Sequence, residues 1–374
     1  MAAVITASLA GCGAAPSSSA TPPSGAIPLQ SASYGMDVIW ATVAMGDLSS
    51  PVNTFWQLLA LKGAGWAVAT PPGVATNGPL AVSPGPADGA TVGVHPSLDL
   101  RFSPLARTNM PGGSWTTGVL PSGLAASPDA LATSKSRHYL ALLAANGGQL
   151  DESTGDLSAW TPLGSGRVLA RSIDPAGCRI AALTAAAFGS GSLPLVGARC
   201  DTAHRVPIFA LVSGSWQLVG PALGGVPTTR TEVLRLVGAP HGAVALVSVG
   251  RGESRRLVVV SSHGIWSRWT QSASLELKGA SLVSTSVSAI GPVIVEMRTN
   301  GGSLVAATVS SGSGAWHRLT RLPAGTAVVA DVPHRGLEAL GVDRSTLHVW
   351  GLGADGTWRA RQVLVVPIQY GSSG

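Results

Sequence analysis

The sequence predicts an all-β fold, and its composition, its short apolar runs and its recurring Trp residues lead to this expectation. The 374 residues include 48 Gly and 26 Pro, and 45% of them are apolar but only 11% are charged. This composition excludes a coiled coil, and the high apolar content excludes a disordered chain. Short runs of Val, Leu and Ile bounded by Gly, Pro or Ser are typical of β-strands between turns.

Seven of the eleven Trp residues mark a repeat. Six of them stand two residues after a small residue, usually Gly, and the first follows Gly65 directly; the interval from one to the next is 42 to 56 residues. They are Trp66, Trp115, Trp160, Trp216, Trp266, Trp316 and Trp358. Runs that favour β-strands precede most of them, at 54–61, 97–102, 206–212, 256–261, 303–309 and 346–350. We expect the repeated indole ring to fill the space between neighbouring repeats.

Further strand-forming runs lie upstream in several repeats. Asn300-Gly301 lies between the run 293–298 and the run 303–309. Asn-Gly favours a tight hairpin because both residues tolerate positive φ. Third runs, such as 168–173 and 326–331, bring each repeat to about four strands.

Seven four-stranded repeats predict a single β-propeller over residues 33–374. Six or eight blades remain open, because the first and last repeats are incomplete. We expect the C-terminal run 363–370 to join the first blade and close the ring, which would remove open sheet edges.

The N-terminal segment, residues 1–32, resembles the start of a bacterial lipoprotein. A short apolar run ends in Leu9-Ala10-Gly11-Cys12. This is similar to a lipobox, whose Cys becomes the new N-terminus and carries a diacylglycerol. The small, polar and Pro-rich residues that follow are those of a flexible tether. No Lys or Arg precedes the apolar run, so we expect the true start upstream; an ordinary disordered N-terminus is the alternative.

Lipidation of Cys12 implies an extracytoplasmic protein on the outer face of the cytoplasmic membrane, or a secreted one. Cys178 and Cys200 are then left as a pair in a compartment that favours disulfides. The runs 178–187 and 193–200 flank a Gly- and Ser-rich turn, and folding them antiparallel sets the two Cys opposite each other. We therefore predict a cross-strand disulfide. Zinc binding is the weaker alternative, because no further Cys or His pair lies nearby.

The repeat is similar to that of the seven-bladed WD40/YVTN/BNR-like propellers of bacterial lipoproteins. It lacks the Gly-His and Trp-Asp dipeptides of WD40 repeats, and the nearest approach to a sialidase Asp-box is Leu-Gly-Ala-Asp-Gly-Thr-Trp at 352–358. The resemblance implies a monomeric binding or assembly platform at the cell envelope. Its partner would be an envelope protein, or an anionic glycan or wall polymer.

The sequence contains no catalytic or cofactor-binding motif. The segment 351–356 matches G-x-G-x-x-G, but a strand-like run follows it, so we interpret it as a hairpin turn. The eight His are dispersed without ligand spacing, and we expect no metal and no cofactor. A sialidase-like hydrolase is the alternative function, although the Glu residues are spread over different repeats. The net charge of +6 comes from scattered Arg and does not favour nucleic-acid binding.

The candidate ligand-binding residues belong to turns that we expect on one face of the ring. By analogy with the fold, ligands bind on the face with the turns between second and third strands and the connections between blades. Arginines in such turns can hold a carboxylate or phosphate. The alternative is that they are solvated charges. The residues are Arg230, Glu232, Arg251, Arg255 and Arg256 in one repeat and Arg344 in the last.

Overall fold

The structure of the protein is a computed structural model. It describes residues 29–34, 38–46, 54–72, 78–85, 88–96, 100–144, 148–172, 178–223, 229–239, 242–264, 266, 268–289, 291–310, 314–319 and 321–366. Cys12 and most of the expected tether lie outside the described residues. Among the residues described, no helix is long and apolar enough to cross a membrane.

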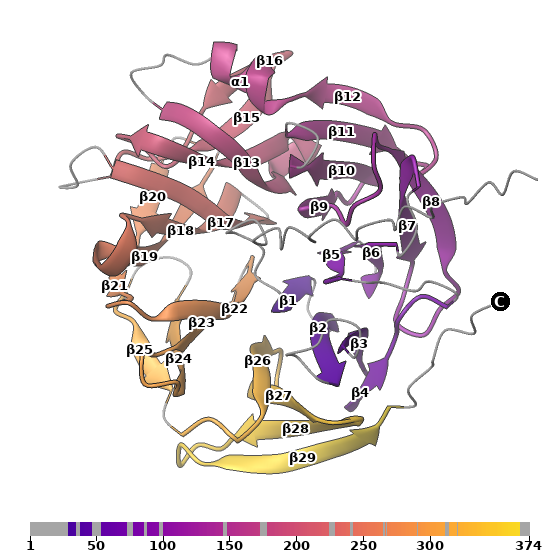
Figure 1. Cartoon of the computed structure of the whole chain (residues 1–374), viewed down its shortest axis with the longest axis vertical. Helices are drawn as coiled ribbons and strands as arrows, with labels where there is room; N and C mark the ends of the chain where they lie inside the picture. Colours follow the sequence, from indigo (N-terminus) through magenta and orange to yellow (C-terminus); the bar gives the residue numbers. More distant parts are fainter. Residues whose placement is uncertain are drawn as a thin grey trace, which may run out of the picture.

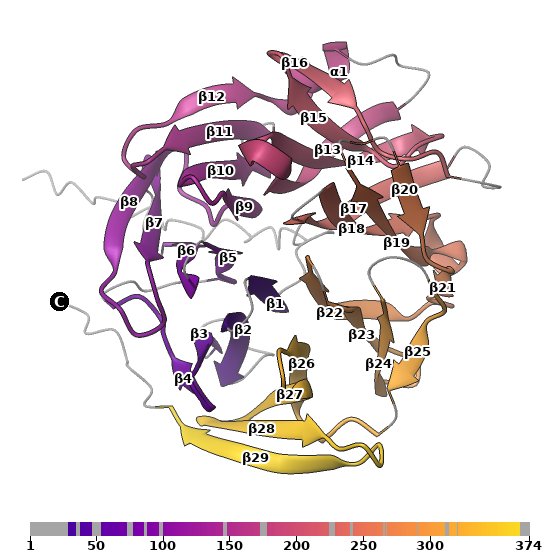
Figure 2. The same cartoon turned by 180° about the vertical axis from the view of Figure 1, so that it is seen from behind.

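The strands form seven successive antiparallel units of four, here called blades 1 to 7, around a common centre (Figures 1 and 2). In each blade the first strand lies nearest the centre and the fourth lies at the rim (Figure 1). This arrangement confirms the predicted all-β propeller.

The first four blades contain the following strands: β1 (Leu29–Tyr34), β2 (Val38–Gly46), β3 (Thr54–Lys62) and β4 (Gly65–Val68) in blade 1; β5 (Ala81–Pro84), β6 (Ala90–Gly93), β7 (Phe102–Thr108) and β8 (Thr116–Pro121) in blade 2; β9 (Ala130–Thr133), β10 (His138–Leu143), β11 (Gln149–Thr154) and β12 (Thr161–Gly164) in blade 3; β13 (Cys178–Phe188), β14 (Pro194–Ala203), β15 (Ile208–Val212) and β16 (Ser215–Leu218) in blade 4.

The last three blades contain β17 (Thr229–Ala239), β18 (Gly242–Val249), β19 (Arg256–His263) and β20 (Arg268–Gln271) in blade 5; β22 (Ser281–Ser288), β23 (Val293–Arg298), β24 (Leu304–Val309) and β25 (His317–Leu319) in blade 6; β26 (Thr326–Val332), β27 (Gly336–Asp343), β28 (Thr346–Leu352) and β29 (Trp358–Val365) in blade 7. The two-residue strand β21 (Leu275–Glu276) pairs with β19.

The strand order gives the ring two distinct faces. The first strand of every blade begins at the face that also carries the turns between second and third strands, because neighbouring strands are antiparallel. We call this the entry face. It includes the start of β1 in blade 1 and the start of β17 in blade 5. β1 also pairs in parallel with β22, so the inner strands of blades 1 and 6 meet at the centre of the ring.

The only α-helix among the described residues replaces a predicted strand. Residues 168–173 were expected to be extended, but α1 spans Gly166–Ser172, so that prediction is wrong. Leu, Ala and Arg are strong helix formers, and the backbone N–H of Val168 donates to Ser165 Oγ (3.4 Å) in the manner of an N-cap. Leu169 is fully buried between blades 3 and 4. Tertiary packing therefore fixes the helix.

Apolar side chains fill every boundary between neighbouring blades. The repeated Trp residues take part, as the sequence indicates. Trp216 Nε1 donates to Leu163 O of the preceding blade (3.4 Å), and Trp316 Nε1 donates to Ala273 O of the preceding blade (2.9 Å). The indole thus contributes apolar area and also satisfies one backbone carbonyl across the boundary.

The ring closes where blade 7 meets blade 1. Residues 363–365 belong to β29 and pair with β28, so the expectation that this run joins the first blade is wrong. Side-chain contacts between blades 7 and 1 close the ring instead. Gln362 accepts a hydrogen bond from the Trp66 backbone N–H (2.8 Å) and donates one to the Trp66 carbonyl (2.9 Å), as a strand neighbour would. Beside Gln362, buried apolar residues of blades 1 and 7 pack together in one cluster.

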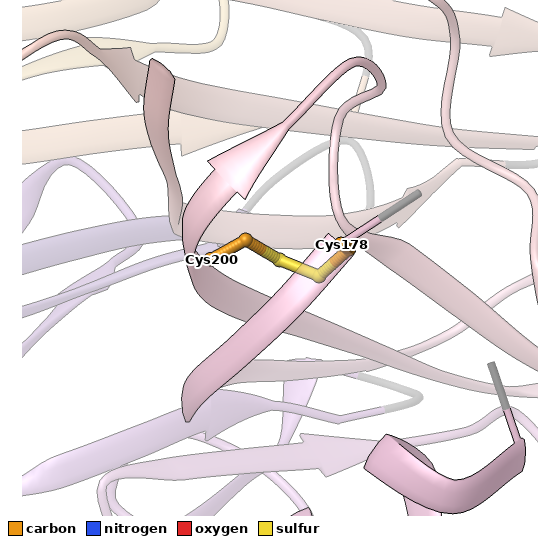
Figure 3. The surroundings of a disulfide bond; sticks show 2 residues. All are labelled: Cys178 and Cys200. Carbon is orange, nitrogen blue, oxygen red and sulfur yellow. A yellow bond between two sulfur atoms is a disulfide. The ribbon is translucent and has the colours of Figure 1, made fainter. Parts of the chain in front are cut away.

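A disulfide joins Cys178 of β13 to Cys200 of β14, with their Cα atoms 5.6 Å apart (Figure 3). The register differs from simple antiparallel folding, because bulges place Cys178 opposite Ala203 and Cys200 opposite Ile180. The bond closes a loop with a sequence separation of 22. A loop of this size stabilises the folded chain by roughly 3 kcal/mol.

Candidate functional site

Blade 5 brings most of the predicted binding residues to its edge on the entry face. Arg230 and Glu232 lie at the start of β17, and Arg251 and Arg255 lie in the turn between β18 and β19. The backbone N–H of Gly250 donates to Arg230 O (2.9 Å), which fixes the turn against the first strand. These four residues therefore lie on the entry face of one blade.

Three of these residues form a compact cluster. Arg230 Nη2 lies 3.7 Å from Glu232 Oε2. Ser248 is opposite Glu232 in the sheet and accepts a hydrogen bond from Arg255 Nε (2.7 Å), which brings Arg255 over the same pair. Burial lowers the pKa of Arg255; the nearby Glu232 opposes this effect and Arg230 adds to it. One carboxylate thus lies beside two guanidinium groups.

The other predicted residues lie outside this cluster. Arg251 is exposed and pairs with Asp201 of blade 4 (3.6 Å), a contact that adds little stability at the surface. Arg256 is the first residue of β19 and stands opposite Glu276. Arg344 lies on the same face but two blades away, in the exposed turn between β27 and β28. Arg344 is therefore not brought together with the blade 5 residues.

Arg235 is the residue that the sequence interpretation missed. It follows a bulge in β17 and stands opposite Leu246, so it faces blade 6, on the same side of the strand as Glu232. Its Nη1 donates to Leu234 O (2.8 Å), but Nε and Nη2 are buried with no partner within the described residues. Burial lowers the pKa of Arg235 to about 10. The side chain is still protonated at neutral pH.

The facing strand of blade 6 adds a second unpartnered group. Thr285 of β22 stands opposite Val295, whose side chain packs toward blade 5, and its Oγ1 is buried with no partner in the described part of the chain. The boundary between blades 5 and 6 therefore holds three arginines, one glutamate and two residues with unsatisfied buried donors. The only sequence signal for Arg235 is that it is the one charged residue in the apolar run 233–239.

Two fully buried carboxylates elsewhere accept hydrogen bonds from neighbouring blades. Glu338 is bonded by Arg335, Arg361 and Trp66, and Glu296 accepts hydrogen bonds from Ser284 and from the Val329 backbone. Within the described ranges, no group of three or more His, Cys, Asp or Glu side chains could hold a metal ion.

Comparison with known proteins supports the fold. No known protein family and no curated protein matches the sequence. The structure resembles a 6-phosphogluconolactonase-like protein from Bacteroides uniformis (TM-score 0.54, 12% identity, 89% of this chain and 97% of that one). It also resembles the BP39L lectin from Burkholderia pseudomallei (TM-score 0.52, 16% identity, 91% and 99%) and a periplasmic gluconolactonase from Pseudomonas aeruginosa (TM-score 0.51, 15% identity, 87% and 96%). These likenesses show a shared β-propeller fold.

Proposed function

We propose that the protein is a binding platform of the bacterial cell envelope, anchored through a lipid on Cys12, that takes an anionic group of a glycan or wall polymer between blades 5 and 6. The observation that carries this proposal is the excess of positive charge at that boundary. Arg230 and Arg255 lie beside one carboxylate, Glu232, and Arg235, buried further along the same side of β17, has no acidic partner among the described residues.

The electrostatics favour an oxyanion at the mouth of this site. Arg235 lies in a medium of low dielectric constant, where a charge is poorly screened and its field reaches further than at the surface. Arg230 and Arg255 lie nearer the entry face of the same blade, and guanidinium groups bind carboxylate or phosphate oxygens in a charge-assisted manner. The similar propellers include a lectin and two gluconolactonase-like proteins, which supports a ligand-binding use of the fold and assigns no ligand.

Loss of an arginine at this site should weaken binding. We expect Arg255→Ala and Arg230→Ala each to reduce the affinity for a purified anionic wall polymer about tenfold or more, because each removes a charged contact. Glu232→Gln should strengthen binding, since it removes the one negative charge. Calorimetry at low ionic strength, with inorganic phosphate as a second probe, measures both effects.

Arg344→Ala is the matched control for that experiment, because Arg344 is an exposed arginine in the equivalent turn of blade 7. Equal losses in the Arg344 and Arg255 variants would show binding by general surface charge and would contradict the proposed site. Crosslinking in intact cells separates the alternatives for the partner: reproducible capture of one protein would favour a protein partner over a polymer.

The anchor is tested separately. We expect Cys12→Ser to move the protein from the membrane fraction to the soluble or secreted fraction, because the thiol is the only site of lipid attachment that the lipobox-like sequence offers. Immunoblotting of fractionated cells measures the shift. Continued membrane association of Cys12→Ser would contradict lipid anchoring.

A further inference from the structure

A concave surface lies at the outer rim, at the boundary between blades 6 and 7. It is an open groove with a volume of about 610 Å³. This volume falls within the range of about 300–1,000 Å³ that is typical of small-molecule sites. The groove is lined by Arg321 and Pro323 from the segment between the two blades, and by Trp350, Asp355, Gly356, Thr357 and Trp358 from the β28–β29 hairpin.

Two indole rings form the apolar wall of this groove. In the β28–β29 register, Trp350 is opposite Ala360 and Leu352 is opposite Trp358, so Trp350 and Trp358 are diagonal neighbours on one face of the hairpin. Both rings pack against the buried cluster between blades 6 and 7. His348 stacks on Trp350, with ring centroids 5.6 Å apart and planes 18° apart. The wall is therefore held in place before any ligand arrives.

Polar groups surround this apolar wall. Asp355 accepts hydrogen bonds from the Thr357 backbone N–H (3.1 Å), Thr357 Oγ1 (2.7 Å) and Arg359 Nη2 (2.6 Å). The hydrogen bonds from Thr357 are the main reason that the pKa of Asp355 is lowered. Gly356, with φ of 74°, allows the tight turn that holds these groups together.

Arg321 is the free donor of the groove. Its backbone has a φ of 53°, an uncommon conformation for a residue with a side chain. The side chain is exposed, and no described residue forms a hydrogen bond or ion pair with its guanidinium. The guanidinium at the edge of the groove is therefore available to donate hydrogen bonds to a ligand.

We propose that this groove binds a pyranose unit of a neutral saccharide. A pyranose ring has an apolar C–H face and a rim of hydroxyl groups, and the groove has the matching division into indole wall and polar edge. Stacking on Trp350 and Trp358 would bury the C–H face, while Arg321 donates to hydroxyl oxygens and Asp355 accepts from hydroxyl groups. A proline-rich peptide is the alternative occupant of an aromatic-lined groove, and the experiment includes one as a probe.

The experiment is a binding screen of the full chain against neutral hexose, pentose and N-acetylhexosamine oligosaccharides by saturation-transfer NMR, with calorimetry on those that bind. We expect Arg321→Ala and Trp358→Ala to weaken the binding of a responding saccharide about tenfold or more. Arg318→Ala and Trp316→Ala are matched controls in blade 6, because both residues lie outside the groove, and they should leave the affinity unchanged. Trp358→Phe keeps an aromatic ring in the core and should retain part of the affinity.

Three results would overturn this proposal. The first is the absence of binding by every saccharide of the panel at millimolar concentration. The second is saccharide binding whose affinity is unchanged in Arg321→Ala and Trp358→Phe, and the third is binding of a proline-rich peptide in place of the saccharides. Because the saccharides are neutral, the Arg255→Ala variant should bind them normally, so failure here and failure of the anionic site are distinguishable.

Discussion

Replacing Glu338 by alanine should lower the free energy of unfolding by about 3–5 kcal/mol, the cost of breaking a buried ion pair. Its carboxylate is fully buried, and Oε1 lies 2.7 Å from both Arg335 Nη2 and Arg361 Nη1. Trp66 Nε1 of blade 1 donates to Oε2 (2.9 Å). The variant would leave two guanidinium groups and one indole N–H without their acceptor at the closure of the ring. Urea denaturation measures the loss.

A nearby surface pair supplies the control for Glu338. Arg359 and Asp355 are 2.6 Å apart but exposed, with 70% and 49% of their side chains accessible, so Arg359→Ala should cost less than about 1 kcal/mol. Amide hydrogen exchange should show the Glu338→Ala variant opening first in blades 1 and 7. A uniform loss of protection over all blades would contradict a specific role in ring closure.

The free energy of unfolding should fall as the pH rises from about 4.5 to about 8, and Glu296 should cause a large part of this fall. Burial raises the pKa of Glu296 from 4.5 to about 8, although Ser284 and the Val329 backbone donate hydrogen bonds that oppose the shift. Between these pH values the folded chain holds a proton that the unfolded chain has released. Stability is therefore lost at up to about 1.4 kcal/mol per pH unit, and no further above pH 8.

Glu296→Gln isolates this effect, because glutamine is neutral at every pH. We expect the variant to lose the slope between pH 5 and pH 8 and to be more stable than the parent chain at pH 8. Glu253→Gln, at an exposed turn of blade 5, is the control and should keep the slope. Denaturation curves at pH 5, 6.5 and 8 measure how the free energy of unfolding of each variant changes with pH. An unchanged slope in Glu296→Gln would mean that Glu296 is ionised in the folded chain.

Features that repeat along the chain could be predicted from the sequence. The Trp period and the Asn-Gly turn depend on residues close in sequence, and they gave the four-stranded repeat and hairpins such as β23–β24. The first and last residues of individual strands were predicted less accurately than the repeat. The run 97–102 was expected to form a strand; residues 97–99 lie outside the described residues, and β7 begins only at Phe102 and includes Pro104, a residue that disfavours strands. Pairing with β6 on one side and β8 on the other makes this segment a strand despite Pro104.

Features that depend on distant segments could not be predicted. Gln362 and Trp66 are 296 positions apart, and no local pattern indicates that they close the ring. The burial of Arg235 and Glu296 also depends on the neighbouring blade, which a single sequence does not place. Whether Arg344 of the last repeat meets the arginines of blade 5 depends equally on the arrangement of the blades, and the structure keeps them two blades apart.

The direction of β1 sets the face at which the chain enters the ring. β1 begins with Leu29 at the entry face, the face on which Arg230 and Arg255 lie. The groove at Trp358 opens instead at the outer rim, between blades 6 and 7. The proposed anionic site and the attachment of the N-terminal segment therefore share one face of the ring, and the proposed saccharide groove lies away from both.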